Sequence, residues 1–558
     1  MIPSRTRFLS AVLDDSPAAY RRALIVVAAL LLVEGVVIAL TGAIPQRLFG
    51  HDVPLLLEGA WRIVQGQVPH VDFATPLGPV TFLLIAAGIK LGGRSADALA
   101  WSVVIAVLAL GAWAWLIGRR VMLPMLAACF TIFIAGLAGS SHFLGMAMQW
   151  ISYSAIYNRL GYAFVCLILV EMFGPSHATL SSRSRVGGMS TGLALAILLF
   201  LKFTYFGAAA GIIACGLLLR ISAVNRRQWM AGFALGFGVV FLAFVIYMHG
   251  HVLAMFGDLR SASAARVALS GNTARVFGNL ANNARDTLLL LLVLFLASRA
   301  DDAGRNAPAP SWRKISAIVP VALVSGIAIV STNFQNAEIP ILSAAVIVLC
   351  EYATRGMRRP VDADSEAGAS RDGRLLSCLL LAGVFVGTPV AGDFASVAYA
   401  AVATRLGHAA IPPERRINAP ALASLDVVDA GSSCGLFAYG AKINKGVDIL
   451  GPVIHADSRV FVMDFSNPFP FALGLQSARG DLVWWHYGTT FSERRFPRPE
   501  GVFREVTLVL VPRCEEDAPS ILALRQLYGP YVEEHYTMKG QNDAWLLLER
   551  NDLVQVAK

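Results

Sequence analysis

Long apolar runs separated by short polar segments fill most of the first 391 residues of the chain. A membrane-spanning helix needs about 20 apolar residues, and shorter runs suffice where a bundle thins the bilayer. By this criterion the pattern predicts a polytopic α-helical membrane protein with about 11 crossings. They lie at residues 23–43, 97–117, 121–139, 160–173, two within 189–220 that turn at 202–205, 229–249, 287–298, 315–332, 341–354 and 375–391.

Residues 79–92 form an apolar run that we do not count as a crossing. The run has about 14 residues, which suits an interfacial or re-entrant helix better than a spanning one. If it crossed, Arg119 and Arg120 would lie outside the membrane; if it does not, they lie in the cytoplasm, where basic residues are enriched. The charge rule therefore favours a helix that does not cross.

The resulting topology places the arginine-rich loops and the N-terminus in the cytoplasm. Arg21 and Arg22 precede the first helix, which lacks an A-x-A cleavage site and is expected to be retained. The predicted external segments are residues 44–78, 140–159, 250–286 and 333–340, and everything after residue 391.

Residues 392–558 have a different pattern, which predicts an extracytoplasmic α/β domain following a transmembrane domain of residues 1–391. Alternating apolar residues at 459–465, 481–487 and 505–512 are typical of strands, and residues 518–536 of a helix. Cys434 and Cys514 are the only cysteines of this part. In an oxidising compartment they could form a disulfide, or they could be two unrelated thiols.

Composition agrees with a membrane protein, since 56% of the residues are hydrophobic and 15% are charged. The net charge of +9 comes largely from short basic pairs between apolar runs, so it reports topology rather than nucleic-acid binding. No Cys or Cys/His spacing typical of a metal site occurs. The compact loops suggest a bacterial inner membrane protein with a periplasmic C-terminal domain.

The first external loop contains carboxylates among turn-forming residues, in the stretch HDVPLLLEGAWRIVQGQVPHVDFATPLGP from residue 51 to 79. Carboxylates next to a membrane are costly to desolvate, so they are usually functional, paired or in contact with water. Pro54 favours a helix that begins near Asp52, where the helix dipole stabilises an ionised carboxylate. We expect the breakers in 65–79 to fold Asp72 back beside Asp52. Alternatively, Asp52 is only a helix cap.

This loop resembles the first external loop of the C-type (GT-C) glycosyltransferases, polytopic enzymes that transfer a sugar from a polyprenyl-phosphate carrier. Their G-x-x-P-x-x-D-F pattern and Gly/Pro turn are matched by Gly66, Pro69, Asp72, Phe73, Gly78 and Pro79. Several members carry an acidic pair where this chain has His51 and Asp52. The resemblance implies that Asp52 is the general base or positions the acceptor, and that Asp72 supports it. His51 and Glu58 are further candidates for substrate binding.

Transfer from a lipid phosphate also requires cations that hold the departing phosphate. Lys202 is the first candidate, at the turn of an apolar hairpin, although it could simply snorkel to the interface. Further candidates could equally form an aromatic belt, contact lipid headgroups or belong to a plain polar loop. They are Tyr157, Asn158 and Arg159 in the second external loop, Arg260 and Arg266 in the third, and Gln335 in the fourth. Trp484 could stack on a sugar or belong to the domain core.

The resemblance implies an inverting glycosyltransferase, a hexosyl- or pentosyltransferase, and the predicted topology places its site at the outer face of the membrane. Its expected partners are a polyprenyl-phosphate sugar donor, a glycan, lipid or protein acceptor, and membrane lipids, but no nucleic acid. No Gly-rich phosphate loop is found, so no nucleotide cofactor is expected; the superfamily is compatible with a divalent metal. The alternatives are a transporter or flippase of lipid-linked saccharides, expected to show repeated halves, and a membrane anchor that presents the C-terminal domain.

Overall fold

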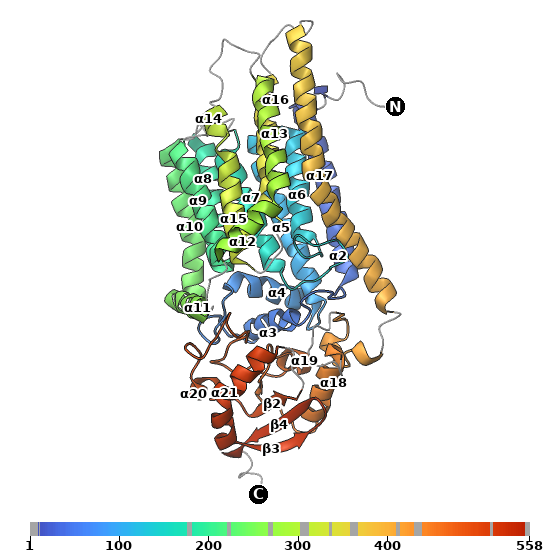
Figure 1. Cartoon of the computed structure of the whole chain (residues 1–558), viewed down its shortest axis with the longest axis vertical. Helices are drawn as coiled ribbons and strands as arrows, with labels where there is room; N and C mark the ends of the chain where they lie inside the picture. Colours follow the sequence, from blue (N-terminus) through green and yellow to red (C-terminus); the bar gives the residue numbers. More distant parts are fainter. Residues whose placement is uncertain are drawn as a thin grey trace.

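The computed structural model describes residues 9–10, 12–175, 181–219, 225–265, 272–301, 312–333, 338–357, 366–408, 413–428, 438–513 and 517–552. A tall bundle of helices stands on a smaller C-terminal domain that contains a β-sheet, and α3 and α4 lie between the two (Figure 1). The polytopic α-helical fold with a C-terminal α/β domain is thereby confirmed.

The bundle is built from apolar helices of unequal length. Within the described residues, six helices are long and apolar enough to cross a membrane, or seven if a bent pair counts as one span. The protein is thus a multi-pass integral membrane protein, but the count of about 11 is not established, because several predicted crossings form shorter helices. The bundle helices are α2 (Pro17–Thr41), α5 (Ala98–Val121), α6 (Pro124–Gly139), α7 (Ile156–Phe173), α8 (Ser181–Leu201), α9 (Phe203–Leu219), α10 (Arg226–Tyr247), α13 (Ala284–Asp301), α15 (Ile318–Thr332), α16 (Ile341–Met357) and α17 (Glu366–His408).

Two segments that were not predicted to cross the membrane form helices of their own. Residues 79–92 form α4 (Pro79–Gly92), which lies with α3 (Asp52–Val64) at the end of the bundle nearest the C-terminal domain (Figure 1). The predicted loop 250–286 contains α11 (Val252–Ala265) and α12 (Asn272–Asn282). A bend of 55° separates Ala274–Asn282 from the apolar helix Ala284–Arg299. The short α14 (Trp312–Ile315) precedes α15.

The predicted hairpin around Lys202 is confirmed, because α8 ends at Leu201 and α9 begins at Phe203. The backbone N–H of Asn225 donates to Ser184 Oγ at 3.1 Å, and Arg226 donates to the backbone oxygen of Leu217. The start of α8 and the end of α9 therefore lie together.

Glycines allow α8 and α10 to approach closely. A Cβ added at Gly192 would lie 2.3 Å from the Phe233 backbone oxygen, and one added at Gly236 would lie 2.2 Å from that of Met189. Gly188 and Gly232 make equivalent contacts four residues earlier, so each helix carries a Gly-x-x-x-Gly pair that brings the two backbones together.

The last helix of the bundle is longer than predicted. α17 has 43 residues with Pro389 inside it, so the predicted boundary at 391/392 falls within this helix. Asp393 ended the apolar run in the sequence. In the structure its side chain is buried and accepts a hydrogen bond from Arg159 at 3.1 Å, so pairing allows the helix to continue inside the bundle.

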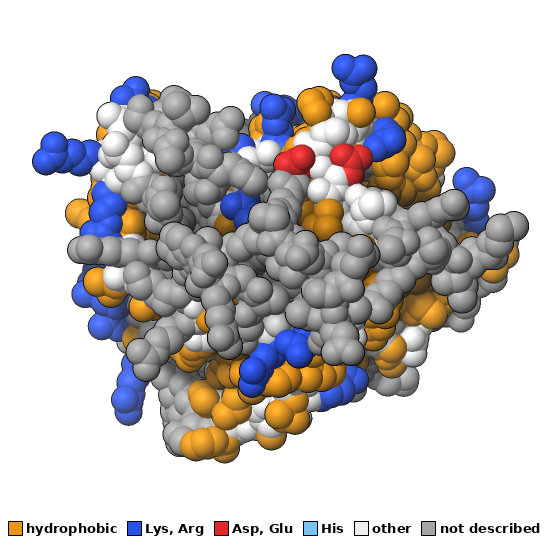
Figure 2. Space-filling view, turned by 90° about the horizontal axis from the view of Figure 1, so that it is seen from above, with side chains coloured by type: hydrophobic (Ala, Val, Ile, Leu, Met, Phe, Trp, Pro, Cys, Tyr) orange, Lys and Arg blue, Asp and Glu red, His pale blue; other side chains and the backbone are white. Residues whose placement is uncertain are grey.

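Basic side chains gather at the end of the bundle away from the C-terminal domain (Figure 2). Arg120 forms an ion pair with Glu171 at 2.7 Å, linking the ends of α5 and α7. Arg355 donates to the Val121 backbone oxygen at 3.0 Å, linking α16 to the end of α5. The predicted grouping of arginine-bearing helix ends is therefore present in space.

The C-terminal domain contains a four-stranded sheet with the order β1-β2-β4-β3. β1 (Val460–Val462) runs parallel to β2 (Leu508–Pro512), whereas β4 (Trp545–Arg550) is antiparallel to both β2 and β3 (Tyr536–Gln541). The predicted helix is confirmed as α21. The helices are α18 (Tyr439–Leu450), α19 (Phe469–Leu473), α20 (Pro499–Val502) and α21 (Ala518–His535), preceded by the 3-10 turns η2 (Pro413–Arg415) and η3 (Pro420–Leu422).

One predicted strand, at residues 481–487, is absent from this sheet. Its backbone instead pairs with the first loop, where the Ala74 N–H donates to the Asp481 oxygen at 2.9 Å and the Val483 N–H to the Ala74 oxygen at 3.3 Å. The alternating pattern therefore correctly indicated an extended backbone, but the segment with which this backbone pairs, at Ala74, lies in the first loop and not in the sheet. Cys434 and Cys514 lie outside the described residues, so their pairing stays a prediction.

Candidate functional site

The first loop is organised by α3, an amphipathic helix that begins at Asp52 and has Arg62 in its last turn. A negative group at the start and a positive group at the end both suit the helix dipole. Gly59 allows α4 to pack closely, because a Cβ there would lie 2.4 Å from the ring of Phe82. Gly66, with φ 86°, then turns the chain away from the helix.

Asp52 is the most unusual carboxylate of the loop. Its Oδ1 atom lies 3.6 Å from His51 Nε2, and 22% of its side chain is exposed. The surrounding protein nevertheless removes most of its hydration, and this desolvation raises the pKa of Asp52 to about 7. A carboxylate with such a pKa can both accept and release a proton near neutral pH.

An aromatic group surrounds the start of α3. The ring of His51 packs edge-on against Phe465 with centroids 4.9 Å apart, and Phe49 lies 5.4 Å from Phe143. Phe465 in turn lies 6.1 Å from Trp484. These rings come from the first loop, the second loop and the C-terminal domain. Periodicity along the sequence could therefore not have grouped them, and apart from His51 and Trp484 sequence reasoning missed them.

The two neighbouring tryptophans have different roles. Trp485 is 2% exposed and belongs to the domain core, where it packs against Phe461. Trp484 lies in the aromatic group, and its indole Nε1 has no hydrogen-bond acceptor among the described residues. Trp484 is half-buried and packs against the hydrophobic core, so its contact with a sugar stays a prediction.

Glu58 was predicted to bind substrate, but the structure buries it within the protein. Its side chain is 1% exposed and accepts a hydrogen bond from Arg62 Nε at 3.1 Å. Arg62 also binds both carboxylate oxygens of Asp481, at 2.5 and 3.0 Å. Glu58 is therefore a positioning residue within a buried ion network that attaches α3 to the C-terminal domain.

Asp72 does not lie beside Asp52, contrary to expectation. It accepts the backbone N–H of Val68 at 2.8 Å and lies 3.5 Å from Arg479 Nε. The next residue, Phe73, packs against Arg62, with 5.2 Å between guanidinium carbon and ring centroid. Because Arg62 follows Asp52 by ten helical residues, about 15 Å along the axis, Asp72 lies near the opposite end of α3. Its turn is stabilised locally.

The structure brings together Lys202, Tyr157 and Asn158, which the sequence offered as separate candidates. Lys202 Nζ donates to Asn158 Oδ1 at 2.9 Å and lies 4.6 Å from the ring centroid of Tyr157. The first loop ends beside them, since the Gly78 N–H donates to the Leu201 oxygen at 3.0 Å. A Cβ at Gly78 would lie 2.0 Å from the Phe200 oxygen, so glycine is required for this approach.

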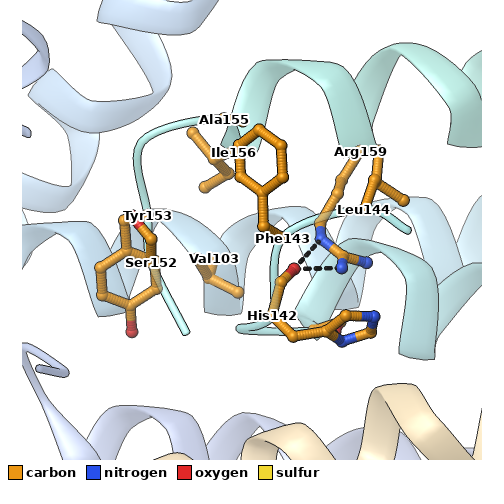
Figure 3. Close-up of a pocket in the computed structure, with 10 residues that line it drawn as sticks. Val103, His142, Phe143, Leu144, Ser152, Tyr153, Ala155, Ile156 and Arg159 are labelled. Carbon is orange, nitrogen blue, oxygen red and sulfur yellow. Dashed lines mark hydrogen bonds between the residues drawn. The ribbon is translucent and has the colours of Figure 1, made fainter. Parts of the chain in front are cut away.

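Arg159 points away from this group and is bound by the protein itself. It donates to the backbone oxygen of His142 (Figure 3). It also donates to Asp393 at 3.1 Å, and its side chain is buried. The cavity beside it has a volume of about 10 Å³, which suits a single water molecule rather than a sugar. Arg159 therefore positions α7 against α17 and is corrected as a substrate-binding candidate.

The third loop contacts the first through Asp258 of α11, a residue that sequence reasoning missed. Its Oδ2 atom lies 2.8 Å from His70 Nδ1 and accepts the Thr75 N–H at 3.2 Å. Arg260 lies on the same helix and is exposed. Arg266 and Gln335 lie outside the described residues. No group of three or more potential metal ligands occurs in the described parts of the chain.

Comparisons with known proteins were made for sequence and for structure. Neither a scan against protein-family models nor a search of curated proteins gives a match. Among solved structures, the chain is similar to ArnT from Cupriavidus metallidurans bound to undecaprenyl phosphate, with a TM-score of 0.46 and 11% identity over 94% of this chain and 97% of ArnT. The apo structure of the same protein gives a TM-score of 0.45 at the same identity and coverage. The similarity extends over nearly the whole length of both chains.

Proposed function

We propose that this protein transfers a sugar from a polyprenyl-phosphate-linked donor to an acceptor hydroxyl, with Asp52 as the general base. The observation that carries the proposal is Asp52 itself. It is a desolvated carboxylate with a pKa of about 7, between the apolar bundle and a polar domain and next to aromatic rings suited to a sugar.

In the proposed reaction, Asp52 takes the proton of the acceptor hydroxyl while the hydroxyl oxygen attacks the anomeric carbon. The bond between that carbon and the phosphate oxygen breaks, and the polyprenyl phosphate leaves with the bonding electrons. Attack opposite to the leaving group inverts the configuration. Lys202, which Asn158 holds beside the end of the first loop, would balance the charge of the departing phosphate.

The distribution of basic residues supports a site on the outer face. Arg120 and Arg355 lie in the last turns of α5 and α16, and Arg185 lies near the start of α8; this end of the bundle is expected to face the cytoplasm. Asp52 begins α3, which lies at the opposite end of the bundle (Figure 1). A lipid-linked donor fits such a site, because its apolar chain can remain in the bilayer while its sugar reaches α3. The bacterial inner membrane and a periplasmic C-terminal domain belong to the same proposal.

The proposal is tested with the purified full-length protein and a panel of polyprenyl-phosphate sugars in nanodiscs. Wild-type protein should release polyprenyl phosphate and form a glycosylated acceptor from a cell-envelope extract, and Asp52→Asn should not. Asp543→Asn is the matched control, since Asp543 is 74% exposed and lies on the C-terminal domain. Movement of intact lipid-linked sugar between leaflets, without cleavage, would instead support a flippase.

A further inference from the structure

A polar cleft of about 340 Å³ lies where the first loop meets one end of the C-terminal sheet. Pockets for small ligands typically measure about 300 to 1,000 Å³. Gln67 of the first loop lines the cleft together with Arg459, Arg479, Arg504 and Arg550 of the C-terminal domain. This cleft adjoins the region that follows α3, at the opposite end of that helix from Asp52.

The sheet fixes several of these arginines. The Arg459 N–H donates to Thr507 Oγ1 at 2.8 Å, immediately before β1. Arg550 is the last residue of β4, and its N–H donates to the Thr507 backbone oxygen at 3.1 Å. Arg459 and Arg550 therefore lie at one end of a hydrogen-bonded sheet, and Arg550 Nη1 donates to the backbone oxygen of Arg504 at 3.3 Å, so the three arginines lie together.

Two of the four arginines that line the cleft have no carboxylate within ion-pair distance among the described residues. Four arginines line it, against the carboxylates of Asp457 and Glu505. Arg479 and Arg550 have carboxylate partners in Asp72 and Asp552. Neither Arg459 nor Arg504 forms an ion pair with any residue that the structure describes. Their guanidinium groups, planar forks of N–H donors, suit a carboxylate or a phosphate.

Gln67 adds an acceptor at the same place. Its side chain is 4% exposed, and its Nε2 donates to the Ser477 backbone oxygen at 2.7 Å, which fixes the orientation of the amide. Its Oε1 has no donor among the described residues. A buried acceptor without a partner is costly, and a ligand hydroxyl would supply the missing donor.

We propose that this cleft binds an anionic saccharide, whose carboxylate or phosphate contacts Arg459 and Arg504 and whose hydroxyl contacts Gln67. We further assign this saccharide to the acceptor, an assignment that rests on the proposed function. Because α3 has 13 residues and is about 20 Å long, the charged group and the hydroxyl that receives the sugar are then several sugar units apart.

Binding is measured on the purified full-length protein by calorimetry, with trigalacturonate and mannose 6-phosphate as charged probes and maltotriose as the neutral probe. At least one charged probe should bind more tightly than maltotriose, and its affinity should fall as salt is added. The double variant Arg459→Gln/Arg504→Gln should weaken that binding about tenfold or more. Arg494→Gln, at an exposed arginine outside the cleft, should leave it unchanged.

Equal binding of charged and neutral probes, or full binding by the double variant at an unchanged unfolding temperature, overturns the inference. Binding of inorganic phosphate without any charged saccharide overturns the assignment of a saccharide. The outcomes also separate the two proposals. If the wild-type protein transfers no sugar but the double variant loses probe binding, the cleft is supported and the transferase is not. If the double variant transfers sugar at the wild-type rate, the transferase is supported and the cleft is not.

Discussion

The start and the middle of α3 carry carboxylates in opposite surroundings. Asp52, its first residue, is partly exposed and has the His51 ring at 3.6 Å. Glu58 is buried and bonded to Arg62, which also holds Asp481 of the other domain. Burial raises the pKa of both carboxyl groups, but at Glu58 the guanidinium of Arg62 opposes the shift.

Under the proposed function, one helix serves chemistry at its start and assembly along the rest of its length. A carboxylate that is desolvated and lacks a guanidinium retains affinity for a proton, as a base requires. A carboxylate bonded to arginine is held in place, and its partners join two segments that are 419 residues apart. We therefore expect substitutions at the start of α3 to affect activity, and substitutions near its end to affect stability.

The largest effect is expected for Asp52→Asn. Removing a general base typically slows a reaction about 100- to 10,000-fold, and the amide keeps the shape of the side chain. Transfer rate and thermal unfolding temperature should be measured on the same preparation, with the rate falling and the temperature unchanged. Retained transfer would remove Asp52 from the mechanism.

Arg62→Leu should show the reverse pattern. It leaves Glu58 and Asp481 buried without their guanidinium, at an expected cost of about 3 to 5 kcal/mol in stability. Thermal unfolding followed by tryptophan fluorescence measures the loss. The triple variant Glu58→Leu/Arg62→Leu/Asp481→Leu should be more stable than Arg62→Leu alone, because no buried charge remains. If the single variant is as stable as wild type, the ion network does not hold the two domains together.

Lys202→Met should lower kcat/KM about 10- to 100-fold by removing a positive charge at the leaving phosphate. Lys202→Arg should recover part of this loss, since it keeps the charge. Lys445→Met is a suitable control, because Lys445 pairs with Asp543 on the surface of the C-terminal domain. Equal rates for Met and wild type at position 202 would mean that another cation meets the phosphate.

The dependence of transfer on pH should report the desolvation of Asp52. The base acts only when ionised and its pKa is about 7, so kcat/KM should rise about tenfold per unit below pH 7 and level off above it. Asp52→Asn should show no such rise in its residual rate. A midpoint near pH 4 would indicate a hydrated carboxylate and contradict the structural explanation.

The smallest effect is expected for Asp72→Asn. The ion pair with Arg479 is half exposed on the arginine side, and such pairs contribute about 0 to 1 kcal/mol. An amide oxygen can still accept the Val68 N–H, so the unfolding temperature and the transfer rate should change little. A loss of transfer as large as that of Asp52→Asn would restore the sequence-based expectation that the two aspartates act together.

Local patterns predicted the features of the fold that depend on few neighbours. The break at Lys202 follows from one charged residue in an apolar run. The short run 79–92 forms a helix of 14 residues beside α3, and the expectation that it does not cross the membrane stays a prediction. The strand predicted at 481–487 was wrong, because its backbone pairs with Ala74 of the first loop. Local periodicity cannot predict a hydrogen bond between two backbone segments that are far apart in the sequence.

The sequence by itself determined the apolar helices, the clustering of arginines at one end and the presence of carboxylates after the first helix, because length, hydropathy and charge act locally. The tertiary structure decided which of these carboxylates is paired. In the sequence, Arg159 was a candidate for substrate binding and Arg62 was not singled out. In the structure, Asp393 binds Arg159 and Asp481 binds Arg62, and each aspartate lies hundreds of residues later in the chain. Whether a charge is satisfied depends on what folds against it, which only the packed chain reveals.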